Sequence, residues 1–262
     1  MITRRTFTAS AASLIAATAA SRLRLGVGTY SYHGLSMDDM IVQLQRLRIA
    51  EIEMSRGEFM LFSKPKAELF ESARKKFDRA GIRCVSYYAA TIRNEAELDD
   101  AIRWAGMLGA RNITADGTGA DLLKRFDEKC TEAKLTVGIH NHFFKGRKFP
   151  YESPEEVLAA LKGLSAAVGA TADTGQFASC GHDPVDAVRK LMPRLKMVHL
   201  KDIEAAGGEV NVLLGKGIAR LPEVIRELRR ANFAGLVAIE YEKEGPVEED
   251  MRMEVEWARK LL

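Results

Sequence analysis

The sequence predicts an α/β protein, a (β/α)8 TIM barrel in a single domain, on three observations. The chain has 262 residues, the usual length of one such barrel, and 47% of them are hydrophobic, which is ample for a sizeable core. Eight short apolar runs alternate with segments of helical period, at a spacing of roughly 30 residues. No G-x-G-x-x-G pattern follows the first run, which disfavours the alternative, an open doubly wound sheet.

The eight apolar runs are the predicted strands. They lie at residues 24–30, 50–54, 82–88, 111–115, 135–140, 168–173, 195–200 and 235–240. The segments between them carry helix start signals; at Ser153-Pro154 a serine can cap the helix and proline suits its first turn. Each helix must return the chain to the same end of the sheet, so neighbouring strands pair in parallel, and eight such units can close a barrel.

The N-terminus, "MITRRTFTASAASLIAATAAS", resembles a twin-arginine export signal. Arg4 and Arg5 precede Phe7 and an alanine-rich, weakly apolar stretch with small residues suited to cleavage near position 20. We expect residues 1–20 to be this signal, residues 21–262 to be the barrel, and the protein to be periplasmic or otherwise extracytoplasmic. The alternative, a short amphipathic helix, is disfavoured by the absence of acids. No later segment offers 18 apolar residues, so no stable membrane insertion is expected.

Charge and cysteine content exclude other classes. The net charge is +3, and it falls to +1 without Arg4 and Arg5, so nothing in the balance calls for nucleic acid. Cys84, Cys130 and Cys180 are odd in number and far apart, which is typical of buried thiols and of neither a disulfide framework nor a zinc knuckle. The sequence leaves a homo-oligomer open.

Metal-binding residue types mark the ends of the last four predicted strands. In chain order they are His140, Asp173, His199 and Glu240. Chemistry in such barrels lies at the C-terminal ends of strands, so we expect these side chains to converge. Each residue alone has a structural explanation: Asp173 could cap a helix, His199 could be a core histidine, and Glu240 could be a rim carboxylate. Such explanations would have to coincide at four strand ends if there were no metal site. Mixed imidazole and carboxylate ligands suit one divalent ion, either Mn²⁺, Zn²⁺, Co²⁺, Fe²⁺ or Mg²⁺.

The stretch "LTVGIHNHFF" places two histidines around one asparagine at the end of the fifth strand. Because strand side chains alternate between faces, His140 and His142 share one face and Asn141 points to the other. The structural alternative is a polar pair that caps the strand.

Motifs along nearly the whole chain after residue 20 resemble the sugar isomerase/epimerase family with a xylose isomerase-like barrel. They are "VGTYSYHG", "EIEMS", "LTVGIHNHFF", "ADTGQ", "VHLKD", "LGKG" and "GLVAIEYE", and the order of the last three is the specific part. The resemblance implies one divalent metal on the four strand-end residues, holding adjacent carbonyl and hydroxyl oxygens of a sugar. It implies an enzyme that abstracts a proton next to the carbonyl of a keto-sugar or related polyol.

The resemblance has one departure. Many epimerases of the family carry a glutamate where His140 stands, and that glutamate pairs with the one on strand eight as acid and base. A metal-bound histidine has committed its lone pair and makes a poor base. The alternative activity is therefore that of a lyase or dehydratase on 3-keto-glycosides or inosose-like keto-cyclitols, which the family also includes.

We assign the expected catalytic groups from the strand face on which each residue lies and from its position at a strand end. Glu240 and His142 are the predicted acid/base pair, with Glu53 at the end of the second strand in reserve at the barrel mouth. Lys201 lies two residues after His199, so it should face the same way and donate to an oxyanion.

Three residues are expected to meet the sugar. Tyr30 and His33 come after the first strand, where aromatic packing is the alternative, and Gln176 stands where relatives often have histidine. An unphosphorylated substrate is expected, although the "LGKG" of residues 214–217 leaves phosphate open.

Two other functions compete. DNA-repair endonucleases share the barrel class. The resemblance to them would imply a three-metal site with many histidine ligands and a basic groove, whereas this chain has five histidines and a near-neutral balance of charge. A non-catalytic periplasmic sugar-binding protein is the remote alternative, and it would need no metal.

The export signal generates the first testable prediction. Changing Arg4→Lys together with Arg5→Lys should retain the precursor inside the cell, because the twin-arginine route requires both arginines. Cell fractionation and immunoblotting measure this. Unchanged export of the double variant would contradict the assignment.

Overall fold

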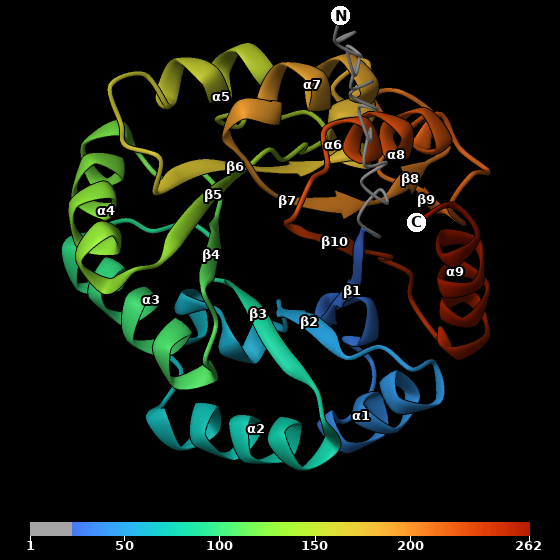
Figure 1. Ribbon diagram of the computed structural model, residues 1–262, viewed down its shortest axis with the longest axis horizontal. Helices are drawn as coiled ribbons and strands as arrows, with labels where there is room; N and C mark the ends of the chain where they lie inside the picture. The colour runs from blue at the N-terminus through green and yellow to red at the C-terminus, as the bar shows by residue number, and fades with distance from the viewer. Residues whose placement is uncertain (1–22) are drawn as a thin grey trace, which may run out of the picture.

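Eight parallel strands close into a barrel in the computed structural model, which describes residues 23–262 (Figure 1). The barrel strands are β1 (Arg24–Gly28), β2 (Glu51–Met54), β3 (Arg83–Tyr88), β4 (Asn112–Ala115), β5 (Thr136–His140), β6 (Val168–Asp173), β7 (Leu195–Leu200) and β10 (Leu236–Ile239). Neighbours in the barrel are in chain order, and β10 closes it on β1 with Leu236 beside Arg24. The predicted fold class is confirmed.

Helices alternate with the strands and form a ring outside the barrel (Figure 1). They are α1 (Met37–Arg46), α2 (Ala67–Ala80), α3 (Glu95–Leu108), α4 (Ala120–Ala133), α5 (Pro154–Ala160), α6 (Thr174–Ser179), α7 (Pro184–Leu191), α8 (Leu221–Arg230) and α9 (Glu248–Leu261). Short 3-10 turns are η1 (Thr29–Tyr32), η2 (Gly57–Phe59), η3 (Leu61–Ser63) and η4 (Met192–Arg194). No helix within residues 23–262 is both long and apolar enough to cross a membrane.

Local sequence accounts for the helix boundaries. The helix α5 begins as expected, with Pro154 in its first turn and a capping box in which Ser153 and Glu156 each accept from the other's backbone N–H. Gly81 and Gly109 end α2 and α3 at φ of 70° and 73°, a left-handed conformation that favours glycine.

The barrel interior is apolar toward the N-terminal ends of the strands and polar toward their C-terminal ends, which are called the lower and upper parts of the lumen. Met197, Leu236 and Ala238 form a small buried cluster in the lower part. Two residues further along β7 than Met197, His199 points into the upper, polar part. Gly138 on β5 makes room there, since a Cβ at this position would lie 2.1 Å from the hydroxyl oxygen of Thr171. The small residue therefore allows polar side chains of neighbouring strands to meet.

Details outside the barrel differ from the sequence-based expectations. The first strand ends at Gly28, so the run predicted at residues 24–30 is two residues too long, and Tyr30 lies in η1 after the strand, as expected of a loop residue. A two-stranded antiparallel ribbon, β8 (Asp202–Ile203) and β9 (Asn211–Val212), was not predicted. The cysteines are free: Cys84 and Cys130 are buried, and Cys180 is partly exposed. The export signal lies outside the described residues, so the division at residue 20 stays a prediction.

Two buried carboxyl groups hold the "LGKG" loop. Asp202 accepts the backbone N–H groups of Gly215, Gly217 and Ala219 at 2.9–3.0 Å. Glu254 on α9 accepts the N–H of Leu214 with both oxygens at 3.2 Å. These N–H groups are already used within the protein, so the loop does not offer the cradle for a phosphate that the sequence left open.

Glu254 generates a prediction on stability. Burial raises its pKa from 4.5 to about 8, with Asp202 and Asp250 adding to the rise. The folded state then keeps a proton that the unfolded chain loses, so stability falls as pH rises from 4.5 to about 8. Glu254→Gln should remove this pH-dependent decrease in the free energy of unfolding, which amounts to on the order of a few kcal/mol. Urea unfolding at several pH values measures it.

The matched control is Glu256→Gln, an exposed glutamate of the same helix, which should leave the pH profile of the wild type unchanged. Equal profiles for wild type and Glu254→Gln would show that the carboxyl is ionised in the fold.

Candidate metal centre

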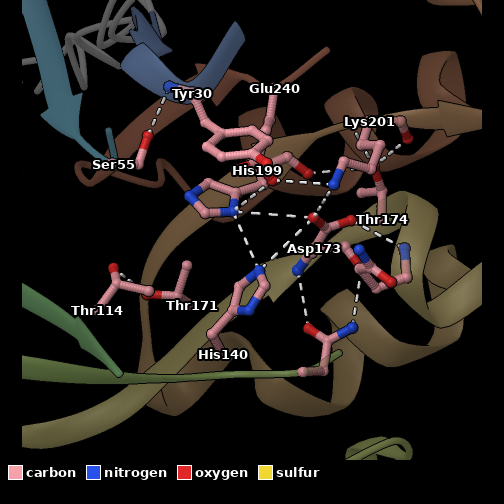
Figure 2. Close-up of polar contacts among 12 residues, drawn as sticks. Tyr30, Ser55, Thr114, His140, Thr171, Asp173, Thr174, His199, Lys201 and Glu240 are labelled. Carbon is pink, nitrogen blue, oxygen red and sulfur yellow. Dashed lines mark hydrogen bonds and ion pairs between the residues drawn. The ribbon is translucent and has the colours of Figure 1, made fainter. Parts of the chain in front are cut away.

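Four buried side chains from consecutive barrel strands converge at the C-terminal end of the barrel (Figure 2). They are His140, Asp173, His199 and Glu240, and one ligand atom from each lies within 4.8 Å of all the others. His140 and Asp173 are the last residues of β5 and β6, His199 is the last but one of β7, and Glu240 comes directly after β10. The expected convergence of the four strand ends is observed.

The atoms that face one another have few other partners. Asp173 Oδ2 and Glu240 Oε2 are buried and accept no hydrogen bond among the described residues, and the Lys201 ammonium lies 3.5 and 3.1 Å from them. The two imidazole nitrogens that join them, His140 Nε2 and His199 Nδ1, lie 3.2 Å apart. Buried carboxylate oxygens without donors are costly unless a cation meets them. The donor set therefore fits one divalent ion, whose identity it leaves open.

Asp173 uses its two oxygens differently. Oδ1 accepts the backbone N–H of Gln176 at 2.8 Å and so caps α6, while Oδ2 points into the cluster. The helix cap that the sequence offered as an alternative is thus present together with the convergence, and it fixes the rotation of the carboxylate.

His199 is oriented from below by Glu53. His199 Nε2 lies 2.6 Å from Glu53 Oε2 and donates its proton to it, so Nδ1 is the nitrogen that faces the cluster and that would present its lone pair to a bound ion. The other oxygen of Glu53 accepts from the hydroxyls of Ser86 and Thr114 at 2.8 and 2.6 Å. Glu53 is fully buried beneath the cluster. The prediction that it reaches the barrel mouth is wrong, because two hydroxyls and an imidazole hold it inside the lumen.

Lys201 brings a positive charge to the same space. Its ammonium lies 2.6 Å from Glu242, 3.1 Å from Glu240 and 3.5 Å from Asp173, and the side chain is almost fully buried. It faces the same way as His199, as the alternation of side chains along the strand predicted.

Mutual charges set the protonation states of the cluster. Burial would raise the pKa of Glu240, but Lys201 and His199 bring it to about 2. Burial would likewise raise the pKa of Asp173, but Lys201 and the imidazoles hold it well below its usual range. For Lys201, burial would lower the pKa, yet the surrounding carboxylates raise it well above its usual value. Both carboxylates are thus ionised, and the lysine is charged, at neutral pH.

Residues 140–142, the "HNH" at the end of β5, each make a different contact. Asn141 points away from the cluster and exchanges two hydrogen bonds with the backbone of Asp173, at 2.8 and 3.0 Å, which ties β5 to β6. His142 stacks on Phe144 at 4.2 Å, and its Nδ1 lies 2.9 Å from the carbonyl of Phe143. The Nδ1 proton therefore points to the carbonyl and Nε2 is left with a lone pair. Burial, with the charges of His140 and Lys201, lowers the pKa of His142, so its ring is neutral at pH 7.

The "ADTGQ" motif is explained residue by residue. The hydroxyl of Thr174 accepts from the backbone N–H of Lys201 and lies 2.7 Å from its carbonyl, which joins α6 to the end of β7. A Cβ on Gly175 would lie 2.5 Å from the stem of Lys201, so only glycine leaves it room. The side chain of Gln176 accepts from the backbone N–H of Phe143 at 2.9 Å and so holds the loop that carries His142.

Two adjoining cavities open above the cluster. The larger has a volume of about 450 Å³ and is lined by His140, His142, Glu240 and Tyr30, among others. The smaller, of about 170 Å³, is lined by polar residues that include Gln176 and Lys201 and by apolar residues that include Phe143 and Ile203. His142, Phe144 and Glu242 line both.

The two candidates after the first strand differ in position. Tyr30 lines the larger cavity, where burial and the charges of Glu242 and Glu240 raise its pKa. The ring of His33 stacks on that of Tyr30, with the centroids 5.0 Å apart, and His33 lines neither cavity. The aromatic packing considered as its alternative is what the structure has.

Sequence reasoning missed Asp116. It comes directly after β4, lines the larger cavity, and accepts from the hydroxyls of Tyr88 and Thr91 at 2.5 and 2.6 Å. The strand-end rule applied to the fourth strand would have found it, because Asp116 lies two residues after the inward-facing Thr114.

Comparisons with known proteins agree with this geometry. A family model described as a xylose isomerase-like TIM barrel matches residues 43–261. Inosose dehydratase of Bacillus thuringiensis (strain Al Hakam) is 27% identical over 141 residues, which are 48% of this chain and 46% of that protein. The chain thus matches about half the length of this curated relative.

Solved structures share the fold. IolI protein with a binding zinc atom has a TM-score of 0.73 at 14% identity and covers 91% of this chain and 98% of its own. D-psicose 3-epimerase in the presence of D-fructose has a TM-score of 0.72 at 15% identity, with 92% and 99% covered.

The contacts of Glu53 generate a prediction on metal affinity. Glu53→Gln should weaken binding of a divalent ion about 10- to 100-fold, since an outer partner fixes the tautomer of the ligand it contacts. His199→Ala should lose most of the metal, because one of four ligands is removed. Isothermal titration and elemental analysis with Mn²⁺, Co²⁺ and Zn²⁺ measure both.

The matched control is Glu51→Gln on the same strand, whose carboxylate instead binds Arg24 and Arg83 at the opposite end of the barrel. Its metal affinity should equal that of the wild type. Full metal content in His199→Ala would contradict the proposed ligand set.

Proposed function

Since the chain belongs to the xylose isomerase-like TIM barrel family, we propose that it is a divalent-metal-dependent isomerase or epimerase that removes a proton next to the carbonyl of a keto-sugar. The observation that carries the proposal is the convergence of His140, Asp173, His199 and Glu240 beneath a cavity that His142 also lines. The zinc atom of IolI, a protein of the same fold, supports a metal at such a site.

His140, Asp173, His199 and Glu240 would hold the ion. When bound, it would supply Lewis-acid polarisation of a sugar carbonyl and orient the neighbouring hydroxyl. His142 is the proposed base, because its neutral ring has a free lone pair at Nε2 and borders both cavities. A base within the cavity wall is shielded from bulk water, which supports proton transfer to and from one carbon.

Glu240 and Lys201 are the proposed partners of His142. The carboxylate of Glu240 lines the cavity, where it would bind the metal through one oxygen and accept a proton with the other. The ammonium of Lys201, fixed by Glu242 at 2.6 Å, can donate a hydrogen bond to an oxygen on which negative charge develops. Tyr30 and Gln176 line the cavities as hydroxyl-binding candidates.

The proposed substrate is an unphosphorylated sugar. The backbone N–H groups of the "LGKG" loop are bound to Asp202 and Glu254, which removes the one phosphate cradle suggested by the sequence.

A second candidate is elimination of the oxygen at the β position, as a lyase or dehydratase on 3-keto-glycosides or keto-cyclitols. The observation in its favour is the 27% identity to inosose dehydratase over about half of either chain. The same proton is removed in both reactions, so isomerisation and elimination diverge only after deprotonation.

Deuterium exchange tests the proposal. The metal-loaded enzyme, incubated in D₂O with ketoses, inososes and 3-keto-glycosides, should incorporate deuterium at the carbon beside the carbonyl, as monitored by NMR. Glu240→Gln should abolish exchange, and His142→Ala should slow it about 10²-fold or more, the range for a general acid or base. The product spectrum separates isomerisation from elimination.

The control is His182→Ala, a histidine that lies outside both cavities. It should exchange at the wild-type rate. Wild-type exchange by His142→Ala would leave its imidazole with a structural role only, and exchange without any metal would overturn the proposal.

A further inference from the structure

A separate cavity lies at the end of the barrel opposite to the metal centre. Its lining includes four arginines, Arg24, Arg74, Arg83 and Arg111. Arg24 and Arg83 are the first residues of β1 and β3, and Arg111 directly precedes β4. Because the barrel strands are parallel, these positions lie at their N-terminal ends, whereas the metal ligands lie at the C-terminal ends. A ligand in this cavity would therefore not share the site of the substrate.

Glu51 binds two of these arginines at once. Arg24 contacts both carboxylate oxygens, with Nε at 3.0 Å and Nη2 at 2.8 Å, and Arg83 Nη2 lies 2.5 Å from Oε1. Glu51 is buried, so the positions of both guanidinium groups are fixed by it. A guanidinium has five N–H groups, and Arg83 uses one of them for this contact, which leaves the others for a ligand.

Arg74 is held from the side by helices α2 and α3. Its Nε lies 2.9 Å from both oxygens of Asp78, and its Nη1 donates to the carbonyl of Leu108 at 2.8 Å. Gly109 makes room for this arrangement, since a Cβ there would lie 1.7 Å from Nη1. Asp78 also lines the cavity, but Arg74 offsets its negative charge.

Arg111 supplies the unbalanced charge. Its guanidinium makes neither a hydrogen bond nor an ion pair with any side chain or carbonyl of residues 23–262. The four arginines stand against two carboxylates, Glu51 and Asp78, so two positive charges remain around one cavity. Like charges repel one another, and an anion of two negative charges would offset that repulsion. The planar fork of a guanidinium matches the oxygens of a phosphate group.

The cavity has room for more than a phosphate group. Its volume of about 270 Å³ lies just below the roughly 300–1,000 Å³ of pockets that take drug-sized ligands, so a small ligand suits it. Ile82, Cys84 and Val85 line it together with the arginines. Burial raises the pKa of the Cys84 thiol to about 12, so this side chain brings no negative charge that would oppose an anion.

We propose that this cavity binds a small phosphate monoester, with its dianionic phosphate group between Arg74, Arg83 and Arg111 and its carbon chain against Ile82 and Val85. The ligand is an effector that stabilises the fold, distinct from the unphosphorylated substrate at the other end of the barrel. It binds the folded chain and offsets the repulsion between arginines of different strands, so it should raise the melting temperature. The inference does not depend on the proposed reaction, because the cavity contains none of the metal ligands.

Calorimetric titration of the metal-loaded full chain with glycerol 3-phosphate tests this inference, with glycerol as the uncharged match. The phosphate should bind at one site and raise the melting temperature, and glycerol should do neither. Arg111→Gln should weaken binding about tenfold or more, the scale of a hydrogen bond to a charged group. The matched control is Arg79→Gln, which removes a positive charge from the last turn of α2 without altering the cavity lining, and it should bind as the wild type does.

Three outcomes would overturn the inference. Equal weakening by Arg79→Gln and Arg111→Gln would show a response to overall charge and no site. Binding that Arg111→Gln leaves unchanged, and that is lost when the metal is removed, would place the phosphate at the metal centre. Sedimentation with vesicles of equal parts phosphatidylcholine and phosphatidic acid, without any binding of glycerol 3-phosphate, would identify a lipid surface as the partner.

Discussion

The hydrogen bond between Glu53 and His199 in the barrel lumen is the contact on which the upper half of the structure depends. A carboxylate that is fully buried is tolerated because three donors meet its two oxygens. This arrangement assigns the proton of His199 to Nε2 and directs the opposite nitrogen to the cluster. The position of Glu53 on β2 thereby links the first half of the barrel to ligands that all come from the second half.

The same principle recurs around the site: buried carboxylates are held by backbone N–H groups or by cations, and each one fixes a neighbouring segment. Asp173 caps α6 with one oxygen and faces the cluster with the other. Asp202 and Glu254 organise the loop after the ribbon. Two oxygens in the cluster, on Asp173 and Glu240, accept no hydrogen bond among the described residues and face only the Lys201 ammonium and the two imidazoles, so a metal ion there would complete the pattern.

Charge balance explains why the ligands, Lys201 and His142 occupy one small volume. The lysine keeps the two carboxylates ionised, and together with His140 it keeps His142 neutral. A neutral imidazole beside ionised ligands is suited to accept a proton, and an ammonium nearby is suited to stabilise an oxyanion.

The sequence by itself determined the eight strands, the barrel and the convergence of His140, Asp173, His199 and Glu240, because strand periodicity and the parallel βα repeat fix which residues end each strand and on which face they lie. It also placed Asn141 on the face opposite to the two histidines. Only the tertiary structure decided that Glu53 lies in the lumen against His199 and that His33 packs on Tyr30 without lining a cavity. Those outcomes depend on side-chain rotation, on the depth of each residue in the lumen and on loop paths. Such features arise from contacts between strands distant in sequence, which no local pattern encodes.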